Sequence, residues 1–353
     1  MNLKQLFLSV FALTALSVGA QTPKWLDPGV NRENRLDNVS NYFAYESEQL
    51  AQQSNKQSSK RYLSIEGTWK FNWVKDAQDR PANFFATDYN DSGWASMPVP
   101  GMWEMNGFGI PIYKNAGYVW ANQFHPNPPF IEERNNHVGS YRRSFAIPAD
   151  WNGDDIFIHI GSATSNLTMY VNGQYVGYSE DSKVAAEFNI TKYIKPGQQN
   201  LIAMQIMRWC DGSYLEDQDF WRLCGIAREC YIYARPKAHI TDLFITPDLT
   251  NNYKDGKLSI KIDAPSATGK TFTVKLVDPQ GNDVTPKQLS GLKIGPDGKG
   301  EAVILKPMRS NGRPRPPTST SSMCRSMMVF NFLSAFPSEW VSARWRLRTP
   351  SCL

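Results

Sequence analysis

The sequence has few of the residues that build metal, phosphate or triad sites. Its four histidines, His125, His137, His159 and His239, are scattered without ligand spacing. It contains no Ser/His/Asp arrangement, no glycine-rich loop that would cradle a phosphate and no metal cluster. No segment has the pattern of a helix of ten residues. These gaps leave no catalytic centre to assign from short motifs, and they argue against a helical fold.

Long apolar runs are scarce after the first residues. The run 6–18 follows Lys4 and leads to small residues before Gln21, which is the pattern of a secretory signal cleaved after Ala20. A membrane anchor, the alternative, needs about 20 apolar residues. This run is shorter, and no later segment is long and apolar enough. We therefore expect an exported protein, periplasmic or secreted, with no membrane partner.

Cysteine is also sparse, with five residues in the whole chain. Two of them lie in the last segment, which leaves Cys210, Cys224 and Cys230. Three cysteines cannot all pair within one chain, and their spacing matches no metal pattern. We interpret them mainly as structural thiols, with a disulfide between Cys224 and Cys230 left open.

Basic residues gather in the last segment instead of spreading over the chain. The net charge is +5, and residues 308–353 carry seven Arg and one Glu, so the rest of the chain is near −1. Nucleic-acid binding needs basic residues clustered on a folded face. No nucleic-acid partner is therefore expected.

What the sequence does have is aromatic residues and turn formers. It is 41% hydrophobic and 12% aromatic, with 23 Pro and 24 Gly. Aromatic side chains suit half-buried strands, which Pro and Gly separate by turns. Residues 67–73 alternate large apolar and polar side chains, and Asn172-Gly173 stands between two strand-like segments as a hairpin signal. The sequence predicts an all-β fold.

The strand pattern divides the chain into parts. The predicted parts are a signal peptide (1–20), an N-terminal arm (21–59), a jelly-roll sandwich (60–236), a partial immunoglobulin-like sandwich (237–307) and a tail (308–353). An immunoglobulin-like sandwich needs about seven strands, and only about four are predicted before residue 308. The second sandwich is therefore expected to be incomplete, with an unpaired edge.

Several stretches carry a family resemblance: LSIEGTWKFNW, VPGMWEMNGFGIPIYKNAGY, YVNGQYVGYSEDSKVAAEFNIT and above all RWCDGSYLEDQDFWRLCGI. They resemble the N-terminal part of glycoside hydrolase family 2 β-galactosidases, from about Trp25 to about Lys306. The resemblance implies a jelly-roll sugar-binding domain and then an immunoglobulin-like domain. In that family a (β/α)8 barrel follows and supplies both catalytic glutamates, so no catalytic residue is expected in this chain.

Two residues match family positions that reach the substrate. The resemblance implies that Asn115 hydrogen-bonds the galactosyl group, and that Asp219 helps to hold a sodium ion and touches the substrate. An amide both donates and accepts hydrogen bonds, and a carboxylate oxygen suits a hard cation. Without the resemblance, Asn115 would be a turn residue, and Asp219 a solvated or paired carboxylate beside Asp211, Glu216 and Asp217. Sodium and magnesium are implied for the full-length enzyme, and neither is assigned to this chain alone.

Tryptophans offer a second type of sugar contact. Trp103, Trp120 and Trp209 would stack on sugar rings if exposed, whereas in a sandwich such residues usually belong to the core.

The last segment, 308–353, differs in composition from the rest of the chain. Its basic residues are all Arg, whereas the preceding body holds 20 Lys and 11 Arg. One interpretation is a natural disordered tail. Another is a change of reading frame: back-translating residues 308–329 and reading two nucleotides downstream permits AEQWTAETPYLYILYVSLNDG, and the same offset from Glu339 permits VGFRKVEIKNAQLL. Both strings resemble later parts of the same family. We expect a disordered, out-of-frame tail after a frameshift near Lys306 or Pro307.

Two classes of function follow. The first is the N-terminal fragment of a retaining β-galactosidase whose partner is a β-galactoside and whose full-length form is a candidate homo-oligomer. The second is a stand-alone carbohydrate-binding module without chemistry. A fragment of another family 2 glycosidase, acting on glucuronides or mannosides, is a further alternative.

Overall fold

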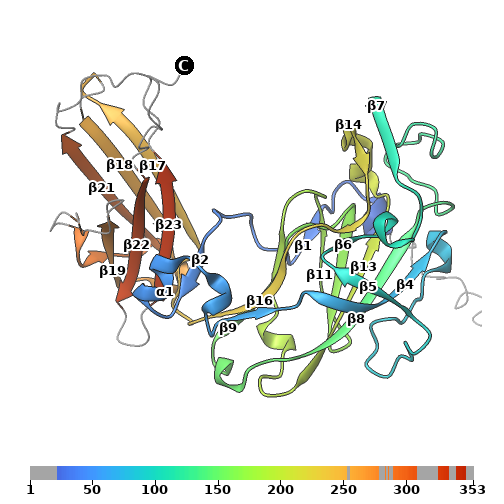
Figure 1. Ribbon diagram of the computed structural model, residues 1–353, viewed down its shortest axis with the longest axis horizontal. Helices are drawn as coiled ribbons and strands as arrows, with labels where there is room; N and C mark the ends of the chain where they lie inside the picture. The colour runs from blue at the N-terminus through green and yellow to red at the C-terminus, as the bar shows by residue number, and fades with distance from the viewer. Residues whose placement is uncertain are drawn as a thin grey trace, which may run out of the picture.

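The computed structural model describes residues 22–252, 255–277, 283, 285, 289–307, 325–333 and 339–346. Its fold is all-β, as predicted, and is built of two sandwiches (Figure 1). The signal peptide predicted over residues 1–20 lies outside the described residues. Among the helices that the structure describes, none is long and apolar enough to cross a membrane.

The first sandwich contains a seven-stranded antiparallel sheet. Its strands, in spatial order, are β1 (Arg32–Glu33), β11 (Gln174–Glu180), β10 (Asn166–Val171), β13 (Gln199–Met207), β8 (Val138–Ala146), β4 (Gly67–Val74) and β5 (Ala95–Val99).

A four-stranded sheet belongs to the same sandwich. Its order is β12 (Ala186–Asn189), β9 (Asp155–Ile160), β16 (Cys230–Arg235) and β3 (Tyr62–Ser64). One apolar core holds residues of both sheets, including Met169 and Met204 from the larger one and Ile158 and Ile232 from the smaller one. Burying alternate residues of each strand gives the period of two that the sequence shows.

The Asn172-Gly173 hairpin is confirmed. It joins β10 to β11, and its two turn residues have φ values of 50° and 80°. A type I′ turn requires positive φ at both positions. The Asn172 amide also donates to the Tyr193 carbonyl at 2.8 Å and accepts from the Leu201 backbone N–H at 2.9 Å, so the turn is tied to the neighbouring strand.

Gly173→Ala should lower the free energy of unfolding by about 1–2 kcal/mol, because a Cβ at this left-handed φ is strained. Urea unfolding followed by tryptophan fluorescence measures the effect. Gly93→Ala is the matched control, since Gly93 has no positive φ and nothing within 4 Å of an added Cβ. Equal losses in the two variants would contradict the assignment of a strained turn.

The second sandwich pairs a three-stranded sheet with a five-stranded one. The first sheet runs β17 (Asp242–Thr250), β18 (Asp255–Asp263) and β21 (Lys299–Pro307). The second runs β2 (Phe43–Tyr45), β23 (Glu339–Arg346), β22 (Arg325–Leu333), β19 (Thr271–Val277) and β20 (Leu292–Lys293). The arm contributes β2 to this sandwich and β1 to the jelly roll.

Two strands lie within the segment expected to form a disordered tail. β22 pairs with β19, and β23 pairs with both β22 and β2, within the sandwich that was expected to keep an unpaired edge. Here the structure differs from the expectation, because these segments, RSMMVFNFL and EWVSARWR, include aromatic and β-branched residues that favour strands. An unpaired β19 would also leave its backbone groups without partners. The rest of the tail lies outside the described residues.

The remaining elements are short. They are α1 (Glu48–Gln53), β6 (Gly101–Met102), β7 (Ile112–Tyr118), β14 (Gln218–Arg222), β15 (Gly225–Ile226) and the 3-10 helices η1 (Lys24–Leu26), η2 (Lys56–Ser58), η3 (Ala77–Asp79), η4 (Glu104–Asn106), η5 (Ala149–Trp151), η6 (Thr191–Tyr193), η7 (Asp211–Leu215) and η8 (Pro265–Ala267).

Candidate functional site

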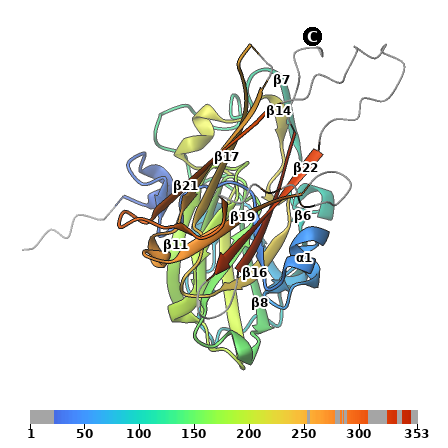
Figure 2. The same cartoon turned by 90° about the vertical axis from the view of Figure 1, so that its left-hand side faces the viewer.

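The two predicted substrate-contacting residues lie on one two-stranded ribbon. β7 carries Asn115 and pairs with β14, which carries Asp219, and the ribbon stands at one end of the jelly roll in both views (Figures 1 and 2). Asp219 falls where the register shifts, and its φ of 48° places it in the left-handed region. Both side chains are exposed. The bulge re-aims the carboxylate relative to a regular strand, which is a usual role of bulges at functional sites.

Large apolar side chains surround these two residues. Tyr113 and Trp221 are paired across the ribbon with ring centroids 5.0 Å apart, and they are 53% and 48% exposed. Phe220 is 51% exposed, and Ile110 and Leu215, which flank the ribbon, are 75% and 83% exposed. Several exposed apolar side chains on and next to one ribbon indicate an interaction site.

A buried arginine fixes the loop that leads into β14. The Arg222 guanidinium is fully buried and forms ion pairs with Glu216 at 3.0 Å and Asp217 at 2.6 Å. It also donates to the Arg208 carbonyl at 2.6 Å and to the Ser213 hydroxyl at 2.9 Å. One cation therefore ties together four points of the segment that ends in Asp219.

The alternative interpretation, a paired carboxylate, applies to the neighbours of Asp219. Asp217 also contacts Lys183 at 3.2 Å, and its side chain is 2% exposed. Asp219 has no ion pair among the described residues. Glu216 and Asp217 therefore hold the loop through ion pairs, whereas the Asp219 carboxylate is free to bind a ligand.

A second buried network lies behind the ribbon. Glu104 accepts from the Cys224 backbone N–H at 2.9 Å, and its other oxygen lies 3.9 Å from Arg208. Arg208 donates to the Ile110 carbonyl at 2.8 Å and contacts His137 Nδ1 at 3.0 Å. Burial and the Arg208 charge lower the pKa of His137 to about 4, so its ring is neutral at pH 7 and accepts this hydrogen bond. The network fixes the chain before β7 and after β14.

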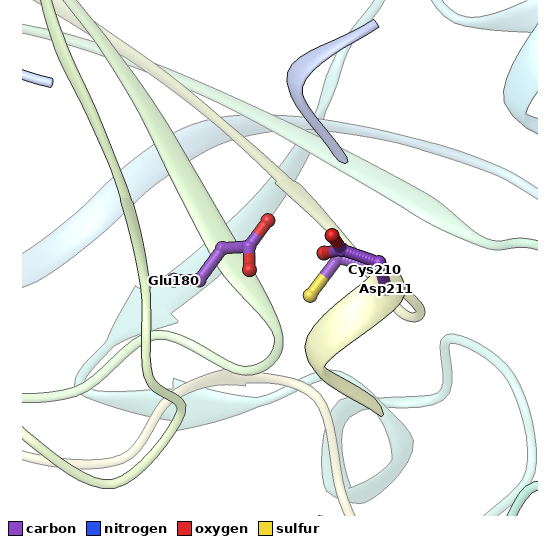
Figure 3. A group of neighbouring side chains, drawn as sticks. All are labelled: Glu180, Cys210 and Asp211. Atoms are coloured by element: carbon purple, nitrogen blue, oxygen red, sulfur yellow. The ribbon is translucent and has the colours of Figure 1, made fainter. Parts of the chain in front are cut away.

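Three buried side chains, two carboxyl groups and a thiol, meet in one group. Glu180 ends β11, and Cys210 and Asp211 stand at the start of η7 (Figure 3). One ligand atom from each lies within 4.8 Å of the others. Burial, together with Asp211, raises the pKa of Glu180 to about 8, and Tyr178 donates to it at 2.6 Å. The carboxyl groups of Glu180 and Asp211 suit a hard cation such as magnesium or calcium. The Cys210 thiol would suit a soft metal instead.

This group differs from the predicted metal ligand. Asp219 stands on the exposed ribbon, whereas Asp211 and Glu180 are buried. Sequence reasoning noted Asp211 only as a neighbour of Asp219 and did not select Glu180. The signal for Glu180 was weak, because only the pairing of the strands brings it beside η7.

Glu180→Gln should remove a pH dependence of stability. The folded pKa of about 8 lies above the ordinary 4.5, so between these values the unfolded chain loses a proton that the folded chain keeps, and stability falls as pH rises. Glutamine copies the protonated form and still accepts from Tyr178. With a chelator present, the variant should be more stable than the parent at pH 8, by about 4 kcal/mol.

Thermal unfolding between pH 5 and pH 9 measures this difference. The exposed Glu301→Gln is the control and should leave the pH profile unchanged. A parallel profile for Glu180→Gln and its parent would show that Glu180 does not carry the effect.

The cysteines and tryptophans are mostly structural. Cys210, Cys224 and Cys230 are free and buried, so the disulfide left open between Cys224 and Cys230 is not formed. Burial raises the pKa of Cys224 and of Cys230 to about 12, which makes both thiols unreactive. Trp103 and Trp209 are buried, as the core interpretation predicts.

Known proteins resemble this chain over most of its length. Residues 62–236 match the family model "Glycosyl hydrolases family 2, sugar binding domain". A β-galactosidase of Priestia megaterium is 37% identical over 268 residues, covering 74% of this chain and 26% of the relative. One of Vibrio vulnificus (strain YJ016) is 42% identical over 198 residues, covering 56% and 18%. The chain thus spans about a quarter or less of these relatives.

Solved structures support the fold. A β-glucuronidase of Bifidobacterium dentium matches with a TM-score of 0.60 at 16% identity, over 83% of this chain and 49% of that one. A glycosyl hydrolase family 2 member from Bacteroides cellulosilyticus matches with a TM-score of 0.57 at 18% identity, over 80% and 36%. The family model and the curated relatives agree, and the chain belongs to glycoside hydrolase family 2, whose sugar-binding domain it carries over residues 62–236.

Proposed function

We propose that this chain is the N-terminal part of an exported β-galactosidase that releases terminal non-reducing β-D-galactose with retention of configuration. A retaining enzyme of this type uses two carboxyl groups about 5–5.5 Å apart. In this proposal both belong to a barrel that is not among the described residues. The observation that carries it is the ribbon: Asn115 and Asp219 are exposed side by side in the fold on an apolar, outward-facing surface.

The ribbon supplies sugar contacts, not the reacting groups. The Asn115 amide donates to and accepts from galactose hydroxyls, and the Asp219 carboxylate binds a hydroxyl and a sodium ion. The apolar side chains around them pack against the barrel and exclude water, which strengthens the polar contacts. Magnesium would bind at the Glu180 and Asp211 carboxylates, away from the sugar.

The galactosidase branch is favoured over the alternatives. The curated relatives at 37% and 42% identity are β-galactosidases, whereas the β-glucuronidase match has 16% identity and concerns the fold alone. A stand-alone carbohydrate-binding module would not need the large exposed apolar surface on the ribbon.

The test uses a chain in which the reading frame is restored after residue 306. It should hydrolyse a chromogenic β-galactoside in preference to the β-glucuronide and the β-mannoside. Asn115→Ala should lower kcat/KM about tenfold or more through lost sugar hydrogen bonds. Asp219→Ala should raise KM and weaken the dependence on sodium. Preferential hydrolysis of the glucuronide would favour another family 2 activity.

A further inference from the structure

Within the described residues, the dipeptide Asn-Gly occurs at three turns of the jelly roll. The three sites are Asn106-Gly107 at the end of η4, Asn152-Gly153 between η5 and β9, and Asn172-Gly173 in the β10–β11 hairpin. Their glycines all have positive φ, at 87°, 94° and 80°, and an added Cβ would meet no atom closer than 3.8 Å. The three sites therefore have similar glycines and differ mainly in how the asparagine side chain is held.

An asparagine that precedes glycine loses its side-chain amide by an intramolecular reaction. The glycine nitrogen gives up its proton to solvent base and attacks the side-chain amide carbon. A carbon–nitrogen bond forms, the bond to the NH2 group breaks, and ammonia leaves. Water then opens the cyclic imide at either of its two carbon–nitrogen bonds, which gives aspartate or isoaspartate. Glycine favours the attack because it has no side chain to block it and restricts the backbone least. The reaction also needs an asparagine side chain that is free to turn onto the backbone.

Asn152 has a side chain of this kind. It is exposed, and no group among the described residues hydrogen-bonds its side-chain amide. Gly153 is also exposed, its backbone N–H donates to no described group, and a Cβ added to it would have nothing within 4 Å. Both the amide that is lost and the nitrogen that attacks are therefore unrestrained by the described fold.

The Asn172 side chain is held on both sides of its amide. Its NH2 group donates to the Tyr193 carbonyl and to the Asn200 side-chain oxygen, both at 2.8 Å. Its oxygen accepts from the Leu201 backbone N–H at 2.9 Å. The side chain must break these three hydrogen bonds before it turns onto Gly173, so the fold slows the reaction here.

Asn106 is an intermediate case. It is exposed, and its NH2 group donates once, to the Met102 carbonyl at 2.8 Å. Its side chain must therefore break one hydrogen bond, fewer than at Asn172 and more than at Asn152. Protection by the fold should decrease from Asn172 to Asn106 to Asn152.

Asn152 also lies near the link between the two sandwiches. Its turn carries Asp150 and Asp154 and leads into β9, whose first residue, Asp155, forms an ion pair with Lys237 of the link. Burial raises the pKa of Asp154, and the charges of Asp155 and Asp150 raise it further. A carboxylate at position 152 would add negative charge to a turn that is already acidic, where the two sandwiches are joined.

We propose that Asn152-Gly153 is a site of spontaneous deamidation in the folded protein, and that hydrogen bonds protect Asn172-Gly173 from the same reaction. The proposal goes beyond the β-galactosidase function, because it concerns a covalent change of the jelly roll and needs neither a barrel nor a substrate. The modified chain carries an additional negative charge. In its isoaspartate form, the main chain is also longer by one carbon atom in the turn before β9.

The experiment follows the folded 353-residue chain during incubation at pH 8, below its thermal transition, by peptide mapping with mass spectrometry. Asn152 should deamidate fastest and Asn106 more slowly. Asn172 should react at least about tenfold more slowly than Asn152, because its hydrogen bonds must break first. A protein isoaspartyl methyltransferase should label the peptide that contains position 152. The rate at Asn152 should rise between pH 7 and pH 9, because the attacking nitrogen must lose its proton.

Two controls test whether the fold sets these rates. The same chain unfolded in urea has lost the hydrogen bonds of Asn172 and Asn106, so its three Asn-Gly sites should react at similar rates. Asn152→Gln lengthens the side chain, so that attack must close a larger ring. This variant should lose the modification at position 152 and keep the parent's rates at the other two sites. Thermal unfolding checks that the variant is folded.

The proposal is overturned if Asn152 in the folded chain deamidates no faster than Asn172. It is also overturned if the same difference persists in urea, since the neighbouring sequence and not the fold would then set the rates. Neither measurement involves galactosidase activity, so this proposal and the proposed function fail independently.

Discussion

The 353-residue chain should show no turnover of a chromogenic β-galactoside, whereas the frame-restored chain should hydrolyse it at enzymatic rates. A (β/α)8 barrel takes about 250 residues, and the described residues form two β-sandwiches without one. A general acid–base and a nucleophile each raise the rate of hydrolysis by a large factor. The rates of the two chains should therefore differ about a millionfold or more. Steady-state assays of both chains, purified in parallel, measure it.

The assay needs a host without its own β-galactosidase. The matched control is a frame-restored chain in which the barrel's two glutamates are replaced, and it should be as inactive as the 353-residue chain. Hydrolysis by the purified 353-residue chain, at a rate above this control, would place the chemistry within the two sandwiches and overturn the proposed division of roles.

Local signals in the sequence predicted the β-sheet architecture well. Alternation over residues 67–73 predicted β4, and Asn172-Gly173 predicted the β10–β11 hairpin, because both depend on neighbouring residues alone. The resemblance supplied Asn115 and Asp219 by motif. The structure places them on one ribbon, although nothing in their separate segments indicates that β7 and β14 pair.

Features that depend on long-range pairing could not be predicted. Glu180 and Asp211 meet only because β11 and η7 are neighbours in the fold. Strand β22 was not expected because its segment was interpreted as out of frame and disordered, whereas pairing with β19 decides the outcome. Local patterns indicate which residues alternate, and tertiary contacts decide which of them meet.

Arg222→Met should be among the most destabilising single substitutions in the jelly roll, with a loss of about 3–5 kcal/mol in the free energy of unfolding. Methionine fills a similar volume but removes the cation that Asp217 and Glu216 share, and Asp217 then keeps only the half-exposed Lys183 at 3.2 Å. The Asp217 and Glu216 side chains are 2% and 22% exposed, so Asp217 in particular cannot be solvated in place. Removing one partner of a buried ion pair costs about this much.

Two further variants resolve the cause. Arg222→Lys keeps the charge but loses the planar fork that bonds two carboxylates, a carbonyl and a hydroxyl, so its loss should be intermediate. Arg228→Met is the control, because Arg228 is exposed and its guanidinium donates to the Lys183 carbonyl at 2.6 Å. That change should cost about 1 kcal/mol or less. Denaturant unfolding at constant pH compares the three.

Arg222→Met also tests whether Arg222 positions the ribbon. In conditions where Arg222→Met is still folded, amide exchange should speed up over residues 213–219, because the loop loses its shared anchor, while β10 and β13 should remain protected. Asp217→Asn in the Arg222→Met background should recover part of the lost stability by removing a buried charge that has lost its arginine partner. If Arg222→Met costs no more than Arg228→Met and leaves exchange in the loop unchanged, then Arg222 does not hold Asp219 in position, and the ribbon's geometry must come from the apolar pair Tyr113 and Trp221 instead.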